Sequence, residues 1–392
     1  MRARHQRVSS LLRLGALAAL VVALAGCAAT RPGAMPAAQA IGPAVDDLDP
    51  ASLALAAERS AAALSAMPPS RTFPLAGGTV TAKDLAGSAK RVAAIARGAA
   101  DPPALTRRLA SDCQAFAAGA PAKVTGYYEP VLAARRAREA RFRYPLYRLP
   151  SPAQLAALEH RLGRMPTRAD IDGHDVLDGL GLEIAWVDDP VARFFLQVQG
   201  SGRLDFGDGT STRIGYAGSN DLPYRSVGGL MLQQGLLEPG RATAPAMRAW
   251  LASHPSRRDA LLFENPRYVF FRETGGDGPV GSLGTTLVAG RSIAADDDVV
   301  PKGILAWLTA SPPAAAEGNG VASRRALARF VFAQDTGAAI QGPGRVDLFE
   351  GSGEGAGLEA GVRNDGGEFF LMLCPARPDP SRMRTSVLGG MR

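Results

Sequence analysis

The chain has 392 residues, of which 46% are hydrophobic and 21% charged. This composition excludes a disordered chain and leaves room for one large or two ordinary domains. There are 45 glycines and 29 prolines, which favours turns and a β-rich fold over a helical bundle. The net charge is +7, but the leader and the tail carry nearly all of it. We therefore expect scattered surface charges, no clustered basic face and no nucleic-acid partner.

The start of the chain is typical of an exported lipoprotein. A basic leader precedes an apolar run from Leu14 to Leu24, which is too short to span a bilayer and fits a signal sequence. The following Leu24-Ala25-Gly26-Cys27 resembles the bacterial lipobox. The resemblance implies that residues 1–26 are removed and that Cys27 is lipidated. Ala28 favours, by analogy, the outer membrane and its periplasmic face. The alternative is an ordinary secretory signal with a chance cysteine.

Helical spacing gives way to strand signals along the chain. Residues 27–50 are rich in Ala, Pro and Gly and predict a flexible tether. Apolar spacing predicts early helices at 51–66, 86–99 and 103–118. Strand patterns then dominate, at 124–130, 142–148, 182–187, 193–199, 267–273, 284–288, 303–308, 329–334, 346–349 and 368–373. Short helices are expected between them, at 152–162, 226–236 and 245–253. Residues 375–392 predict a disordered tail.

Two cysteines follow the leader, Cys113 and Cys374. They could pair in an oxidising compartment. We favour two separate buried thiols, because Cys113 shares a predicted helical face with Leu105 and Leu109 and Cys374 follows an apolar strand. No Cys or His spacing typical of a metal site occurs, so neither a metal nor a cofactor is expected.

Four segments place aromatic and polar side chains together beside glycines, at 125–130, 195–202, 214–226 and 265–271. Sugar rings stack on aromatic faces, and their hydroxyls need fixed donors and acceptors. Each segment alone suits core packing equally well. Gln199 is the strongest candidate, at the end of a predicted strand before Gly200. The candidate substrate-binding residues are Thr125, Tyr127, Tyr128, Gln199, Ser201, Tyr216, Tyr224, Arg225 and Tyr268.

Three aspartates are the candidate acid/base residues: Asp347, Asp335 and Asp296. Apolar strand residues flank Asp347, which predicts partial desolvation and a raised pKa suited to an acid near neutrality. Asp335 precedes Thr336-Gly337 and is typical of a turn. Asp296 begins an acidic run that predicts a loop. An aspartic protease is excluded, because no second Asp-Thr/Ser-Gly supplies a partner carboxylate.

These motifs, in this order, resemble the MltA family of membrane-bound lytic murein transglycosylases. The resemblance covers about 124–373 and includes Tyr127-Tyr128, the stretch from Gln199 to Gly202, and residues 215–217, 223–226 and 266–271. The C-terminal part resembles the family's 3D domain, whose three aspartates fall on Asp296, Asp335 and Asp347. Ala338 is a small departure from the usual Gly or Ser after Asp-Thr-Gly.

The resemblance implies a mainly β fold of two domains. Residues 51–130 and 275–374 would form a double-ψ β-barrel similar to barwin and some endoglucanases, with the 3D domain at 290–374. Residues 131–274 would form an inserted β domain, and a groove between the two would hold a glycan.

The implied reaction cleaves the β-1,4 bond between N-acetylmuramic acid and N-acetylglucosamine of peptidoglycan without water and leaves 1,6-anhydro ends. One carboxylate then suffices, and we expect it to be Asp347, with Asp335 and Asp296 positioning loops or tuning the local field. Two alternatives remain: a peptidoglycan hydrolase that uses water, and a non-catalytic peptidoglycan-binding lipoprotein. No motif indicates a protein partner.

Overall fold

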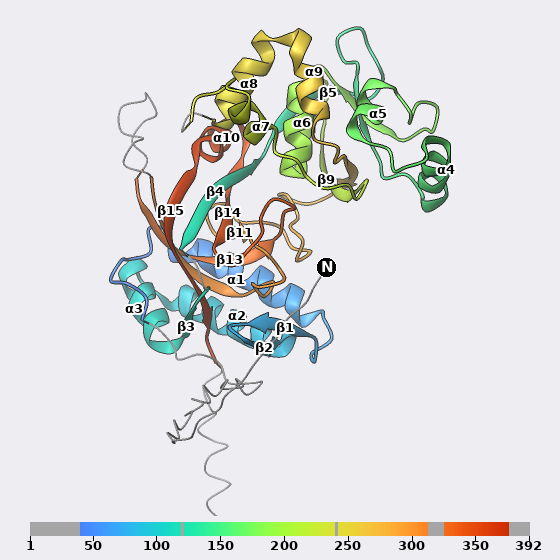
Figure 1. Cartoon of the computed structure of the whole chain (residues 1–392). Helices are drawn as coiled ribbons and strands as arrows, with labels where there is room; N and C mark the ends of the chain where they lie inside the picture. Colours follow the sequence, from blue (N-terminus) through green and yellow to red (C-terminus); the bar gives the residue numbers. More distant parts are fainter. Residues whose placement is uncertain (1–39, 119–120, 240–241, 313–324, 376–392) are drawn as a thin grey trace, which may run out of the picture.

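The computed structural model describes residues 40–118, 121–239, 242–312 and 325–375. Two large sheets dominate it, which confirms a mainly β fold, and the N-terminal helices pack beside one of them (Figure 1). The predicted signal, Cys27 and most of the tail lie outside these residues. Within the described ranges, no helix combines the length and the apolar character needed to cross a membrane.

Six strands close into a barrel in the order β12-β13-β11-β14-β4-β15, because β12 also pairs with β15. The pairs β11–β13 and β14–β4 are parallel and the others antiparallel. A short strand, β3 (Gln114–Ala117), adds to β15. The barrel strands are β4 (Ala122–Glu129), β11 (Ser292–Ala294), β12 (Leu305–Ser311), β13 (Leu327–Asp335), β14 (Arg345–Ser352) and β15 (Asn364–Leu373). The double-ψ connectivity stays a prediction.

Alternate side chains of the barrel strands point inward and form the core, and the side chains between them point outward. Val124, Ile293, Val346 and Leu348 are fully buried in one core cluster. Successive side chains of a strand point to opposite faces. Thr125 on β4 and Asp347 on β14 therefore project from the outer face of the barrel.

The second sheet has the order β10-β9-β8-β5-β7-β6. Its strands are β5 (Val131–Arg135), β6 (Tyr144–Tyr147), β7 (Glu183–Val187), β8 (Ser201–Asp205), β9 (Ser211–Ser219) and β10 (Val269–Thr274). All come from between β4 and β11. We propose from this distribution that residues 131–274 form a domain inserted into the barrel domain.

Helices α1 (Pro50–Ser65) and α2 (Ala82–Gly98) cover the outside of the barrel below its strands in Figure 1. They bury Trp307 and Phe330 in a shared cluster. Helix α3 (Pro102–Asp112) follows, and a hairpin of β1 (Thr72–Leu75) and β2 (Gly78–Thr81) joins the first two helices.

The remaining helices belong to the region of the second sheet, except for the last. Helix α10 (Gly353–Val362) follows β14 and packs against β4. The others are α4 (Pro152–Leu162), α5 (Arg168–Gly173), α6 (Pro190–Gln199), α7 (Val227–Gln233), α8 (Ala244–Ser253) and α9 (Pro255–Phe263).

Three sequence predictions about elements are wrong. Residues 193–199 form part of α6 rather than a strand, because Asp189 caps the helix, Pro190 starts it and Gly200 ends it at a φ of 78°. Residues 284–288 hold only an isolated bridge between Val280 and Thr286. The helix expected to reach residue 118 ends at Asp112.

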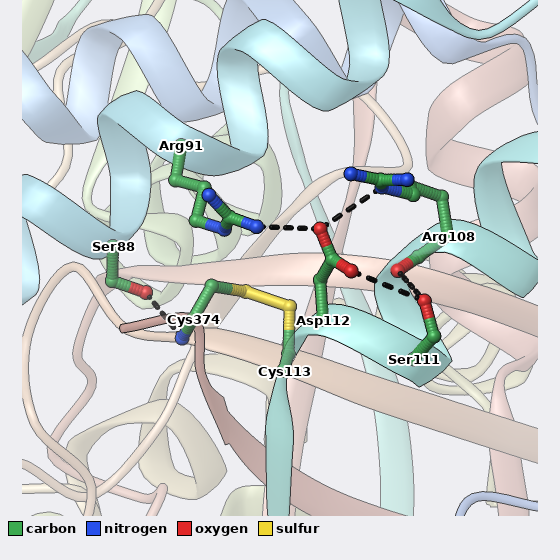
Figure 2. Close-up of a disulfide and its surroundings, with 7 residues drawn as sticks. All are labelled: Ser88, Arg91, Arg108, Ser111, Asp112, Cys113 and Cys374. Atoms are coloured by element: carbon green, nitrogen blue, oxygen red, sulfur yellow. Dashed lines mark hydrogen bonds and ion pairs between the residues drawn. A yellow bond between two sulfur atoms is a disulfide. The ribbon is translucent and has the colours of Figure 1, made fainter. Parts of the chain in front are cut away.

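Cys113 and Cys374 form a disulfide, which corrects the prediction of two separate thiols (Figure 2). Because α3 ends at Asp112, Cys113 leaves the helix and meets the end of β15. The Cys374 N–H donates to Ser88 Oγ on α2 at 2.9 Å. The bond joins positions 261 residues apart and ties β15 to the start of β3.

Candidate active site

Asp347 and Asp335 lie in one row across the outer face of the barrel. Ala294 on β11 is the register partner of Asp347 on one side and of Asp335 on the other. Thr125 on β4 is the next partner of Asp347. Register partners project from the same face of a sheet. Only the small Ala294 side chain separates the two acids, whose strands lie about 10 Å apart.

A bulge places Asp335 in this row. The pairing of β11 with β13 shifts between Ile293 and Ala294, so that Gln334 is an extra residue. Ile293 and Ala333 remain in the barrel core, and Asp335 comes opposite Ala294. Bulges are often found where a strand must redirect a functional side chain. The turn predicted for Asp335 is thus corrected to the end of β13.

Burial raises the pKa of Asp347 to about 6. Its Oδ1 accepts a hydrogen bond of 2.5 Å from Thr125 Oγ1. This bond and the Arg345 charge favour the ionised form, whereas the charges of Asp335 and Glu350 disfavour it. An aspartic acid with this pKa retains its proton for part of the time near neutrality, which a general acid requires.

Asp335 is held by three donors. Its Oδ1 accepts from the N–H groups of Ser282 and Thr336, each at 2.9 Å, and its Oδ2 accepts from Tyr127 Oη at 3.1 Å. Burial raises the pKa of Asp335, and these donors oppose the shift. Burial and the two carboxylates raise the pKa of Tyr127 well above its usual value, so the phenol stays a donor. Asp335 is therefore oriented and has little freedom to react.

Asp296 lies beyond the row, two residues after the end of β11. Its Oδ2 accepts from the Gly342 N–H at 2.6 Å and its Oδ1 from the Asp298 N–H at 3.1 Å. Gly342 belongs to the loop that joins Asp335 to Asp347. The Asp296 carboxylate thus fixes this loop to the end of β11.

The end of β4 connects the acid row to the second sheet. Gln199 Oε1, at the C-terminus of α6, accepts from the Tyr128 N–H at 2.9 Å. Glu129 is fully buried and accepts from Arg213 Nε on β9 at 3.1 Å and from Ser352 Oγ on β14 at 2.7 Å. These bonds fix the orientation of the second sheet where the chain leaves the barrel. Gln199 acts here from a helix end and not from the predicted strand.

The other predicted contact residues are more dispersed. Ser201 is partly buried on β8, and the Tyr216 side chain on β9 is 47% exposed and accessible to a ligand. Tyr224 is partly buried, and Arg225 is exposed and paired with Glu264. Within the described ranges, no hydrogen bond or ion pair joins these four residues to the aspartates.

Tyr268 is fully buried beside Tyr147 and Phe270 in the inserted region. It cannot contact a glycan in this structure, which corrects its prediction as a substrate-binding residue. The unbroken apolar run from Tyr268 to Phe271 could have indicated a core position.

Sequence reasoning missed several residues that shape the site. Ser282 and Thr336 supply backbone donors, and the Arg345 and Glu350 charges act on Asp347 in opposite directions. Arg345 and Glu350 flank the strand predicted at 346–349, so their influence on Asp347 was visible in the sequence. The Ser282 contact joins positions 53 residues apart and had no local signal.

Two surface hollows with volumes of about 520 Å³ each lie on the helical side of the barrel. The first is lined by residues of α1 and α2, and the second by the end of α1, the first half of α2 and the end of β15. The three aspartates line neither of them, and the predicted glycan groove stays a prediction.

Comparison with known proteins relates this geometry to a family. Residues 123–272 match the MltA specific insert domain, and residues 291–373 match the 3D domain. The lytic transglycosylase LtgG of Burkholderia pseudomallei is 35% identical and superposes with a TM-score of 0.53, covering 87% of this chain and 98% of that one. The chain belongs to the MltA family.

Other MltA relatives match over different lengths. A membrane-bound lytic murein transglycosylase from Agrobacterium tumefaciens is 29% identical with a TM-score of 0.69, covering 88% of this chain and 99% of that one. The membrane-bound lytic murein transglycosylase A of Escherichia coli K12 is 34% identical over 63% of this chain. That match spans 64% of the E. coli protein, a little under two thirds of its length.

Proposed function

We propose that this MltA-family protein is a lytic transglycosylase that cleaves the β-1,4 bond between N-acetylmuramic acid and N-acetylglucosamine and leaves 1,6-anhydromuramoyl ends. The names of its relatives supply the substrate and the class of reaction. The observation that carries the proposal is Asp347, whose pKa of about 6 suits proton donation to a leaving oxygen.

In the proposed reaction, Asp347 donates its proton to the glycosidic oxygen as the bond to C1 of the muramoyl sugar breaks. The C6 hydroxyl of the same sugar attacks C1, and the Asp347 carboxylate takes the hydroxyl proton. The acid is regenerated and water is not consumed. An intramolecular hydroxyl in good orientation reaches effective molarities of about 10⁵ M or more, which compensates for the absence of a second catalytic carboxylate.

A hydrolase is the alternative that a specific observation favours. Ordinary glycosidases use two carboxylates, and Asp335 lies in the same row as Asp347. The three donors on Asp335 argue against this role, because a carboxylate so engaged is a weak base or nucleophile. We assign Asp335 to orientation and to raising the pKa of Asp347, and Asp296 to holding the intervening loop.

The glycan contacts are proposed for the accessible candidates. Tyr216 offers an exposed ring for a sugar face, and Tyr128 and Gln199 join the two sheets beside the acid row. Thr125 and Tyr127 donate hydrogen bonds to the acids, and Ser201 follows Gln199 by two residues at the start of β8. Tyr224 and Arg225 have weaker support, because Arg225 is already paired with Glu264.

We also propose that Cys27 carries lipid and holds the protein at the periplasmic face of the outer membrane. Two of the relatives described above are named membrane-bound. The disulfide suits an oxidising compartment such as the periplasm. Replacing Cys27 with Ala should move the protein from the membrane fraction to the soluble periplasmic fraction, and retention in the membrane would contradict the lipid anchor.

Digestion of purified sacculi tests the proposed activity. The wild type should solubilise them, and Asp347→Asn should not, although it should still cosediment with them. Asp298→Asn is the matched control, because Asp298 is an exposed acid of the neighbouring loop. Wild-type protein that binds sacculi without releasing soluble fragments would instead indicate a non-catalytic binder.

A further inference from the structure

Five arginines gather at one end of the inserted sheet. Residues 135–143 hold Arg135, Arg136, Arg138, Arg141 and Arg143 against a single acid, Glu139. They lie at the end of β5 and in its connection to β6, which is the edge strand of the sheet. The last four are exposed. The expectation of scattered charges without a basic cluster is therefore wrong in this region, which we call the arginine face.

Aromatic rings support these guanidinium groups. Arg136 lies 3.9 Å from the centre of the Phe206 ring, and Arg135 lies 4.4 Å from that of Phe142. Arg138 lies over Trp186 at 5.6 Å and Arg143 over Tyr144 at 5.3 Å. A guanidinium stacked on a ring still presents its N–H edge, which matches a carboxylate in two-point contact. Stacking also reduces the side-chain freedom lost on binding.

Within the described part of the chain, two of the five arginines lie within ion-pair distance of a carboxylate and three do not. Arg141 pairs with Asp188 at 2.6 Å, and Arg135 lies 3.7 Å from Glu139. Among the described residues, no carboxylate forms an ion pair with Arg136, Arg138 or Arg143. Asp208 also interacts electrostatically with Arg136, without forming an ion pair. The arginine face thus keeps a net positive charge toward solvent.

The position of the face favours a polymeric ligand. β5 continues β4 through Pro130, and Arg135 follows Thr125 of the acid row by ten residues. An extended chain of that length spans at most about 36 Å. The face therefore lies no more than about 36 Å from the acid row, within the reach of a long glycan strand bound at that row.

We propose that the arginine face binds the carboxylates of peptidoglycan peptide stems and so holds the sacculus beside the catalytic row. This inference rests on the proposed function, which makes peptidoglycan the substrate. Stems carry free carboxylates at regular intervals along the glycan, which complements a row of arginine edges. The contact is non-catalytic and electrostatic, and it weakens with added salt.

Cosedimentation with intact sacculi tests the proposal. The triple variant Arg136→Gln, Arg138→Gln, Arg143→Gln should bind about tenfold more weakly than wild type and digest intact sacculi more slowly. The matched control removes three exposed arginines outside the inserted region, Arg71→Gln, Arg107→Gln and Arg325→Gln, and should behave like wild type. On glycan whose stems have been removed by an amidase, the wild type and both variants should bind and react alike.

Equal binding of intact sacculi by wild type and the first triple variant would overturn the proposal. Wild-type binding to stem-free glycan as tight as to intact sacculi would overturn it too. So would a triple variant that loses binding to phosphatidylglycerol vesicles but keeps its affinity for sacculi. Failure of the proposed function looks different: the wild type would release no anhydro fragments, while the cosedimentation comparison would still give its result.

Discussion

Asp347 and Asp335 share one face of the barrel but differ in what surrounds their oxygen atoms. Asp347 accepts a hydrogen bond from Thr125, and Asp335 accepts bonds from the neighbouring Thr336 N–H and from Tyr127 and Ser282 on other segments. The apolar neighbours of Asp347 on its strand were enough to predict its raised pKa from the sequence. The bonds from Tyr127 and Ser282 to Asp335 were not predictable, because they depend on a bulge and on a loop 53 residues away.

The pH dependence of activity should report the interaction between the two acids. Asp347 must be protonated to act, so we expect kcat/KM on sacculi to fall as the pH rises above about 6. The Asp335 charge contributes to that raised pKa. Asp335→Asn removes the charge and should move the falling limb to lower pH. A limb that stays in place in this variant would contradict the coupling, and Asp298→Asn should leave it unchanged.

The same pKa makes Asp347 a source of instability at neutral pH. The folded pKa of about 6 exceeds the unfolded value of 3.8, so the stability that this carboxyl contributes is full below pH 4 and lost as pH rises through 6. The difference in unfolding free energy between Asp347→Asn and wild type should therefore shift in favour of the variant between pH 4 and pH 7.5, by up to about 3 kcal/mol. Thermal unfolding of both proteins at the two pH values measures this. The same stability difference between variant and wild type at both pH values would contradict the raised pKa.

At the scale of elements, the strands that carry the aspartates were predictable and their supports were less so. Residues 329–334 contain a short apolar run, residues 346–349 are apolar apart from Asp347, and both lie within observed strands. The prediction of a strand at 193–199 is wrong, because a short apolar segment fits a strand or a helix, and here Asp189 and Gly200 cap a helix. The disulfide was missed because the end of α3 decides whether Cys113 can reach Cys374.

Removing the disulfide should destabilise the barrel without abolishing catalysis. The bond closes a long loop and joins the end of β15 to the start of β3, away from the acid row. The double variant Cys113→Ser, Cys374→Ser should lose about 2–5 kcal/mol of unfolding free energy, measured by urea denaturation. A reductant should lower the midpoint of the wild type and leave the variant unchanged. Equal midpoints for the two proteins without reductant would contradict a stabilising bond.

At the scale of the molecule, the segment before α1 is part of the fold. Asp46 and Arg291 are buried and form two hydrogen bonds of 2.7 and 2.9 Å, and Asp46 also accepts from the Phe330 N–H. This pair joins the C-terminal part of the expected tether to the start of β11 and to β13, the strands that position Asp335. The predicted tether of residues 27–50 therefore ends before Asp46. Composition alone indicated flexibility and could not reveal a buried partner 245 residues away.

Asp46→Ala should destabilise the protein by about 3–5 kcal/mol, because it leaves the buried Arg291 charge without its partner. The adjacent Asp47 is a matched control: it is exposed and pairs with Arg329. Asp47→Ala should cost about 1 kcal/mol or less. Urea unfolding compares the two variants, and similar losses in both would contradict a structural role for the Asp46–Arg291 pair.

The masses of the fragments released from sacculi test the central claim most directly. If Asp347 acts with the C6 hydroxyl as nucleophile, the muramoyl fragments end in 1,6-anhydro rings and are lighter than hydrolysis products by one water molecule. Asp347→Asn should release neither kind of fragment. Fragments that carry the additional water as their first product would contradict the account and identify a hydrolase.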